Sequence, residues 1–262
     1  MKQDRISEKC AYGKVLVLLA GAAIFLGVGL HTQKCYAIEA TELEPAGDLD
    51  PGMLKIEGRL QYEKYDEYEL VLENSIEYDF SKKWRLELTA PLGKMEHEKT
   101  EIEDTELEVK YVFNPDSETF PVVALEFETL FPTAKHSHGI DESVCLFLDQ
   151  HLGKSEWNHQ LHLNFAETFI GGAEEEDRRF RYEAIAGYSV NLTPQTSLTA
   201  DFIREQLEEH GENANIIEAG LKHEFNDTFA IAGGVGHGIG EESPEWQAQL
   251  GFEIRLGIKK NK

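Results

Sequence analysis

The chain has 262 residues, a net charge of −24, and 28% charged against 41% hydrophobic residues. This length fits one large all-β domain or two small domains. Nucleic-acid binding needs clustered lysine and arginine, and the absence of a basic stripe from this acidic sequence argues against such a partner. A membrane β-barrel remains compatible with the composition, because lipid-facing and lumen-facing residues alternate along its strands and average out.

Residues 1–37 have the features of a cleaved secretory signal peptide. Four basic residues precede an unbroken run of apolar or small residues at 15–30, and Cys35 and Ala37 place small residues before a cleavage site. The alternative is a transmembrane anchor, but the run is slightly short for a span and polar residues follow it directly. Cleavage would leave Cys145 as the only cysteine, so the exported chain is expected to contain no internal disulfide.

Residues 38–53 are acidic and contain two prolines and two glycines, so we interpret them as a short periplasmic lead-in. From 54 to 257 apolar and polar residues alternate with period two, which predicts strands and not helices. Most of the predicted strands reach the ~9–11 residues that a tilted membrane strand needs. The twelve predicted strands are 54–62, 68–80, 83–93, 104–113, 120–131, 142–152, 156–169, 179–190, 196–207, 215–225, 228–239 and 245–257.

The connections between these strands alternate between short and long along the chain. Counted from the first hairpin, even-numbered connections are predicted to be short, whereas odd-numbered ones are mostly longer and charged; 63–67 is the exception. Membrane barrels show this division, with short periplasmic turns and longer outer loops. The sequence therefore predicts an all-β fold, a twelve-stranded antiparallel up-and-down transmembrane β-barrel at 54–257, followed by a C-terminal tail at 258–262.

Aromatic residues gather at the ends of the predicted strands, as in the two interfacial girdles of a membrane barrel. The alternative is the core of a soluble barrel, whose aromatics would spread along the strands. One predicted girdle contains Phe80, Trp84, Phe113, Phe120, Trp157, Tyr188, Phe225 and Phe229, and the other Tyr62, Tyr68, Phe131, Phe169, Phe180 and Trp246.

Four stretches, 104–113, 120–133, 161–165 and 236–255, resemble the outer-membrane transporter family named after the meta pathway of phenol degradation. The resemblance covers most of residues 54–257, and it implies a barrel with a transport role and no catalytic motif. One departure is the C-terminus. Outer-membrane barrels usually end on an aromatic residue, whereas this chain continues past Leu256 to Lys262.

Histidines and serines are the residues of this sequence that could form a metal or catalytic site. His136 and His138, near Asp141 and Glu142, could bind a transition metal, but a polar exposed loop is the favoured interpretation. The serines near histidines are too local or too far apart for a nucleophile triad. The glycines at 233–238 have no following lysine or helix to hold phosphate, so we expect them to let a strand bend. We therefore predict no catalytic residue, metal or cofactor.

The inward face of the predicted strands carries about twice as many acids as bases. This mixture can form an ion-pair network that fills a narrow barrel, or it can line a wet channel; we favour a partly filled lumen with a narrow pore. The residues predicted to line the pore are Glu57, Arg59, Arg85, Glu87, Glu106, Glu108, Lys110, Glu126, Glu128, Arg181, Glu183, Asp201, Glu218, Lys222, Glu253 and Arg255.

The predicted function is passive passage of small solutes through the outer membrane of a Gram-negative cell, either with a preference for cations or for small aromatic or hydrophobic compounds. Two alternatives are an outer-membrane lipid hydrolase or deacylase and a structural barrel with a filled lumen, including one that is soluble in the periplasm. The expected partners are outer-membrane lipid and lipopolysaccharide, the permeant, and the barrel assembly machinery.

Overall fold

A computed structural model describes residues 39–47, 49–95, 100–117, 120–135, 137–153, 155, 157–173 and 177–257. The predicted signal peptide (1–37) and C-terminal tail (258–262) lie outside these ranges. Within them, no helix is long and apolar enough to cross a membrane.

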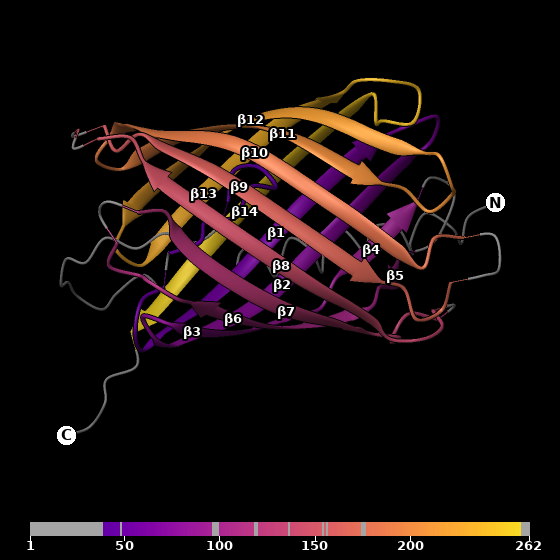
Figure 1. Ribbon diagram of the computed structural model, residues 1–262, viewed down its shortest axis with the longest axis horizontal. Helices are drawn as coiled ribbons and strands as arrows, with labels where there is room; N and C mark the ends of the chain where they lie inside the picture. The colour runs from indigo at the N-terminus through magenta and orange to yellow at the C-terminus, as the bar shows by residue number, and fades with distance from the viewer. Residues whose placement is uncertain are drawn as a thin grey trace, which may run out of the picture. The chain divides into compact units, whose positions relative to one another are not determined.

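The described part of the chain contains fourteen strands, and twelve of them close into an antiparallel ring (Figure 1). Each strand of the ring pairs with its neighbours in chain order, and β1 closes the ring by pairing with both β2 and β14. This confirms the predicted twelve-stranded barrel. The ring consists of β1 (Met53–Lys64), β2 (Tyr68–Ser81), β3 (Trp84–Thr89), β6 (Thr105–Val112), β7 (Val122–Phe131), β8 (Asp141–His151), β9 (Gln160–Phe169), β10 (Phe180–Thr193), β11 (Thr196–Gln206), β12 (Asn213–Asn226), β13 (Phe229–Gly238) and β14 (Trp246–Gly257).

The third predicted strand is interrupted. Pro91 follows Ala90 and has no backbone N–H for the ladder, so β3 ends at Thr89 and pairing with β2 resumes in β4 (Leu92–Met95). A short strand, β5 (Glu101–Ile102), pairs with β4 beyond the ring.

The two ends of the barrel have different connections. At the end that we call the turn end, 82–83, 194–195 and 227–228 are two-residue turns, but 113–121 and 152–159 are longer than the sequence predicts. Pro121 cannot pair, and Asn158 and Gly153 have positive φ, so β7 and β9 start later than predicted. The opposite end, the loop end, carries 65–67, 96–104, 132–140, 170–179, 207–212 and 239–245.

The two faces of the wall invert the pattern of a soluble protein. Charged side chains such as Lys55, Lys110 and Arg255 are buried inside, whereas Leu250 on the outer face is 61% exposed. Large apolar side chains on the neighbouring strands, Val235 on β13 and Leu60 on β1, are also exposed. A soluble barrel would turn this apolar face inward, so the soluble alternative is wrong and the wall has the surface of a lipid-facing barrel.

Most aromatic side chains of the two predicted girdles are exposed near the ends of the wall, whereas Tyr68, Tyr188 and Phe229 are half-buried. They form close pairs across neighbouring strands: at the turn end, the ring centroids of Trp84 and Tyr111 are 4.6 Å apart. At the loop end, those of Phe169 and Phe180 are 5.4 Å apart. Amphipathic rings favour the boundary between hydrocarbon and water, so both ends of the apolar band are suited to that boundary.

Candidate functional site

An inner segment, residues 39–50, crosses the barrel interior; we call it the plug (residue 48 is outside the described ranges). Its backbone is held by wall side chains: Ala46 N donates to Asp149 Oδ2 at 2.7 Å, and Asp50 N donates to Asp79 Oδ2 at 2.6 Å. Asn164 Nδ2 donates to Glu44 O at 2.9 Å. These bonds reach strands on different sides of the ring, so the plug is fixed within it.

Apolar contacts also hold the plug. Leu43 packs in a buried cluster with Ile185, Ile203 and Ile216, and Leu49 packs in another with Phe147. These wall residues occupy inward positions of their strands, where a water-filled channel would place polar side chains. The sequence placed residues 38–53 outside the barrel, and that expectation is corrected here. In the sequence, only the apolar residues at inward strand positions indicated that another segment packs inside the barrel.

Glycines make room for the plug. A Cβ added at Gly234 or Gly220 would collide with the carbonyl oxygen of Ala40. Gly234 belongs to the stretch in which the sequence suggested glycines for strand bending. Its observed role is instead the close approach of the plug backbone to the wall.

Opposite charges are paired at the turn end. Lys55 Nζ is 2.5 Å from Glu77 Oε1, Arg85 contacts Glu77 at 3.0 Å and Asp79 at 2.9 Å, and Arg255 lies 3.0 Å from Glu224. We call Lys55, Glu77, Asp79, Arg85, Glu224, Glu253 and Arg255 the turn-end network. A buried ion loses much solvation, so such groups remain charged only when they are paired and hydrogen-bonded.

A row of glutamates lies on the inner face between this network and the loop end. Direct cross-strand pairs join Glu87 to Glu108 and Glu108 to Glu128, so three acids stand side by side on β3, β6 and β7. Glu87 also pairs directly with Glu77 of the network. Like charges directly opposite each other destabilise a sheet. The row therefore gathers carboxyl groups on this part of the wall with no base between them on the paired strands.

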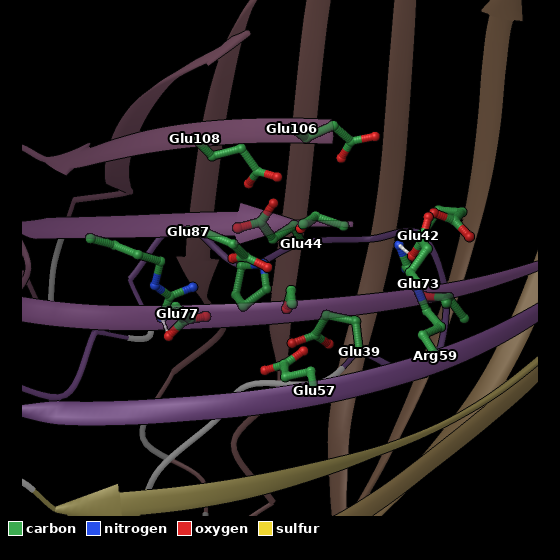
Figure 2. A pocket seen from close by; sticks show the side chains of 15 residues that line it. Glu39, Glu42, Glu44, Glu57, Arg59, Glu73, Glu77, Glu87, Glu106 and Glu108 are labelled. Atoms are coloured by element: carbon green, nitrogen blue, oxygen red, sulfur yellow. Dashed lines mark hydrogen bonds and ion pairs between the residues drawn. The ribbon is translucent and has the colours of Figure 1, made fainter. Parts of the chain in front are cut away.

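The plug divides the acidic interior into two chambers. The first, about 220 Å³, is lined by nine carboxylates and two arginines, and Figure 2 shows Glu39, Glu42 and Glu44 of the plug among the wall glutamates. The second, about 470 Å³, is lined by nine carboxylates and one arginine, together with apolar side chains. Glu42, Glu44, Glu106 and Glu108 border both. Carboxyl groups therefore outnumber basic groups in the lining of each chamber.

The plug carries part of this charge and is itself anchored by it. Glu44 bonds the ammonium of Lys110, which also donates to Pro45 O at 3.0 Å, and Glu42 accepts from Gln61 Nε2 at 2.8 Å. Burial disfavours the charged form of Glu44, but the ammonium of Lys110 and the guanidinium groups of Arg85 and Arg59 outweigh burial. The pKa of Glu44 is therefore lowered below its ordinary value of 4.5.

Ten of the sixteen sequence-predicted pore residues border a chamber, and six do not. Glu57, Arg59, Arg85 and Glu87 border the first chamber, Glu126, Glu128, Arg181 and Glu183 border the second, and Glu106 and Glu108 border both. Lys110 and Glu218 hold the plug, and Glu253 and Arg255 belong to the turn-end network. Asp201 and Lys222 are buried in the interior and border neither chamber. The role of these residues in conduction remains a prediction.

Sequence reasoning missed a hydrogen-bonded chain on β8, β9 and β10. Ser189 Oγ lies 2.8 Å from His162 Nε2, and His162 Nδ1 lies 2.7 Å from Asp149 Oδ1. The other oxygen of Asp149 accepts the plug amide of Ala46. The three residues alternate with outward neighbours and are far apart in sequence, so only the strand registers bring them together.

The histidine loop gives no metal site in the described ranges. His136 lies outside them, and within them no group of three or more His, Cys, Asp or Glu side chains could hold a metal ion. The carboxylates that line the chambers are thus spread over the wall and do not converge on one point.

The closed antiparallel ring, polar interior and apolar outer band define a barrel of the outer-membrane type. Solved structures agree: the KdgM porin superposes with a TM-score of 0.55 at 11% identity, covering 76% of this chain and 98% of that one. The KdgM porin in complex with disordered oligogalacturonate superposes with a TM-score of 0.53 at 10% identity, covering 77% of this chain and 98% of that one. The NanC porin superposes with a TM-score of 0.53 at 11% identity, covering 78% of this chain and 100% of that one.

At this identity the likeness shows the fold alone, which is that of porin-type outer-membrane barrels. No family model matches the sequence, and no curated protein matches it. The resemblance to the phenol meta-pathway transporters therefore remains a prediction.

Proposed function

We propose that this chain is an outer-membrane channel for the passive passage of small solutes, with a preference for cations and a lumen narrowed by the plug. The observation that carries the proposal is the pair of chambers, each lined by nine carboxylates and at most two arginines, inside a barrel with an apolar outer band. Walls of low dielectric strengthen the field of such charges, so cations are concentrated and anions repelled.

The same charge argues against two other solutes. Oligogalacturonate, named for the KdgM complex, is an anionic sugar chain, and the glutamate row would repel it. A small aromatic or hydrophobic compound, the other permeant suggested at the sequence level, would have to cross chambers lined mainly by carboxylates. The sequence suggested either cations or small aromatic or hydrophobic compounds as permeants. The carboxylate-rich lining favours the proposal of cations.

The proposal includes an exported barrel whose outer band contacts lipid, whose turn end faces the periplasm, and which the barrel assembly machinery inserts. An epitope placed in the 170–179 connection tests this orientation, because it lies at the loop end. Antibody should bind it on intact cells. Binding only after permeabilisation would reverse the orientation.

Recording from purified protein in a planar bilayer tests the channel. We expect small, stable conductance steps in potassium chloride, because the plug leaves chambers of limited volume on either side. No conductance from the wild type or from a variant with a displaced plug would favour the structural barrel with a filled lumen.

A second candidate, an acyl hydrolase, is favoured by the chain of Ser189, His162 and Asp149, whose bonded atoms match those of a nucleophile triad. Ser189 Oγ would attack an acyl carbonyl while His162 Nε2 takes the hydroxyl proton and passes it to the leaving alcohol. Water, giving its proton to His162, would then release the acid and restore Ser189. We rank it second because Ser189 lines neither chamber.

A fluorophosphonate probe separates the two candidates. Covalent labelling of the wild type and not of Ser189→Ala would establish the nucleophile. If neither protein is labelled, the hydrogen-bonded residues Ser189, His162 and Asp149 have a structural role only. That role is to hold Asp149 where it accepts the plug amide of Ala46.

A further inference from the structure

We infer that the second chamber binds organic cations that carry an ammonium group on an apolar body, and not metal ions or neutral solutes. This inference rests on the proposed cation-preferring channel and names its class of solute. The chamber's volume of about 470 Å³ lies within the range of small-molecule sites. Its lining combines the acids of β6 and β7 with apolar side chains such as Phe147, Ile185 and Leu130.

Two buried polar groups in the lining lack the partners that they require. Glu126 is 4% exposed and, in the described part of the chain, makes no hydrogen bond or close ion pair. Its cross-strand neighbour is Lys110, whose ammonium is already bonded to Glu44 and Pro45. Asn164 is 8% exposed, and its Oδ1 has no partner while its Nδ2 holds Glu44 O. Both groups can accept hydrogen bonds from an ammonium.

The protein already holds one aliphatic ammonium at the border of this chamber. Lys110 Nζ bonds a carboxylate and a backbone carbonyl and lies 3.9 Å from the centroid of the Phe147 ring. Carboxylate, carbonyl and aromatic face together form the environment that binds alkylammonium ions. The intramolecular ammonium thus shows how a free amine would be recognised beside it.

The spread of the acids argues against a metal ion. Within the described ranges no three of these side chains converge closely enough to ligate one ion. Ca²⁺ needs six to eight oxygens at about 2.3–2.6 Å. An organic cation needs no such convergence, because its charge is met by the field of several carboxylates and its body by the apolar part of the lining.

Cys145 provides a reporter within the chamber. It is the only cysteine after residue 37, it borders the chamber, and it pairs directly with Glu126 across β7 and β8. The probe is 2-phenylethylammonium, and the readout is the rate at which neutral iodoacetamide alkylates Cys145 in the purified barrel. We expect the amine to slow alkylation, and neither 2-phenylethanol nor Ca²⁺ at the same concentration to do so.

Matched variants locate the effect. Glu126→Gln with Glu128→Gln should raise the amine concentration needed for half-protection by about tenfold, because two nearby charges are removed. Glu57→Gln with Glu87→Gln removes the same charge from the first chamber only and should leave that concentration within about twofold. Heat-modifiable gel migration reports that each variant is folded.

Several outcomes would overturn the inference: equal protection by 2-phenylethanol, stronger protection by Ca²⁺, or protection unchanged in Glu126→Gln with Glu128→Gln. If Cys145 does not react in the free barrel, equilibrium dialysis with labelled 2-phenylethylammonium replaces alkylation, and absence of saturable binding would overturn it. Failed binding in a barrel that still prefers cations in bilayers rejects only this inference. Binding in a barrel that conducts no ions rejects the channel instead.

Discussion

The turn-end network and the glutamate row occupy one continuous inner face, but acids are paired with bases in the network and not in the row. In the network each arginine or lysine lies within 2.5–3.0 Å of a carboxylate. In the row, Glu87, Glu108 and Glu128 stand opposite one another without an intervening base. The comparison indicates that paired charges fill and fix the barrel, whereas unpaired acids are kept at a cost to stability and serve its interior chambers.

The plug connects the two regions. Asp50 binds to the network through Asp79, and Glu42 and Glu44 enter the acidic chambers. Its bonds to Lys110 and Gln61 use bases and amides at the border of the row. Displacing it would merge the two chambers, so in the proposed channel its attachment would set how much of the acidic wall a solute meets.

The largest effect is expected from breaking the network. Arg85→Met leaves Glu77 and Asp79 buried without their guanidinium partner and should cost about 3–5 kcal/mol of folding free energy. Arg181→Met removes a half-exposed arginine paired with Glu208 at 3.4 Å and should cost at most about 1 kcal/mol. Urea unfolding followed by gel migration measures both. Equal losses would show that the buried pairs of the network contribute no more to stability than an exposed pair does.

A charge on the outer face should have the next largest effect. Leu250→Arg should cost about 2–4 kcal/mol if that position lies near the bilayer midplane. Thr168→Arg, in the lining of the second chamber, should be tolerated, because its charge meets carboxylates and not lipid. Refolding yield in lipid vesicles gives the comparison, and a tolerated Leu250→Arg would contradict the lipid-facing assignment.

Loosening the plug should change conductance more than stability. Gly234→Ala places a Cβ against Ala40 and should disfavour the docked plug by about 1–3 kcal/mol, as overpacking does. Gly233→Ala, one residue away, meets the wall oxygen of Gln249 at 3.2 Å and no plug atom, so it should not displace the plug. Larger single-channel steps for Gly234→Ala alone would support the plug as the constriction. Identical steps would place the constriction elsewhere.

The smallest effect is expected from acidification. The lowered pKa of Glu44 means that its bond to Lys110 is fully present above 4.5 and is lost as the pH falls through its folded value, since protonation removes the carboxylate charge. Losing this bond should loosen the plug, so conductance should rise at acid pH in the wild type. Part of that rise should be missing in Glu44→Gln, which lacks the carboxylate at every pH. Identical pH profiles for the two proteins would show that this pair does not hold the plug.

Much of the barrel could be predicted from the sequence, because period-two alternation reports directly which face each residue occupies. The inward placement of Glu108, Glu126 and Arg255 follows from that parity. The plug could not be predicted in this way, since its prolines and glycines form no periodic pattern. The contact of Ser189 with His162 also escaped, because a hydrogen bond between strands depends on register and tilt.

The reversal potential under a potassium chloride gradient tests the central claim most directly. The wild type should prefer potassium, and the preference should weaken at high salt, as the Debye length falls from about 10 Å at 0.1 M to about 3 Å at 1 M. Glu108→Gln with Glu128→Gln should lose much of it, whereas Arg181→Met should strengthen it slightly. A chloride preference in the wild type, or a potential unchanged in the double glutamine variant, would contradict the account.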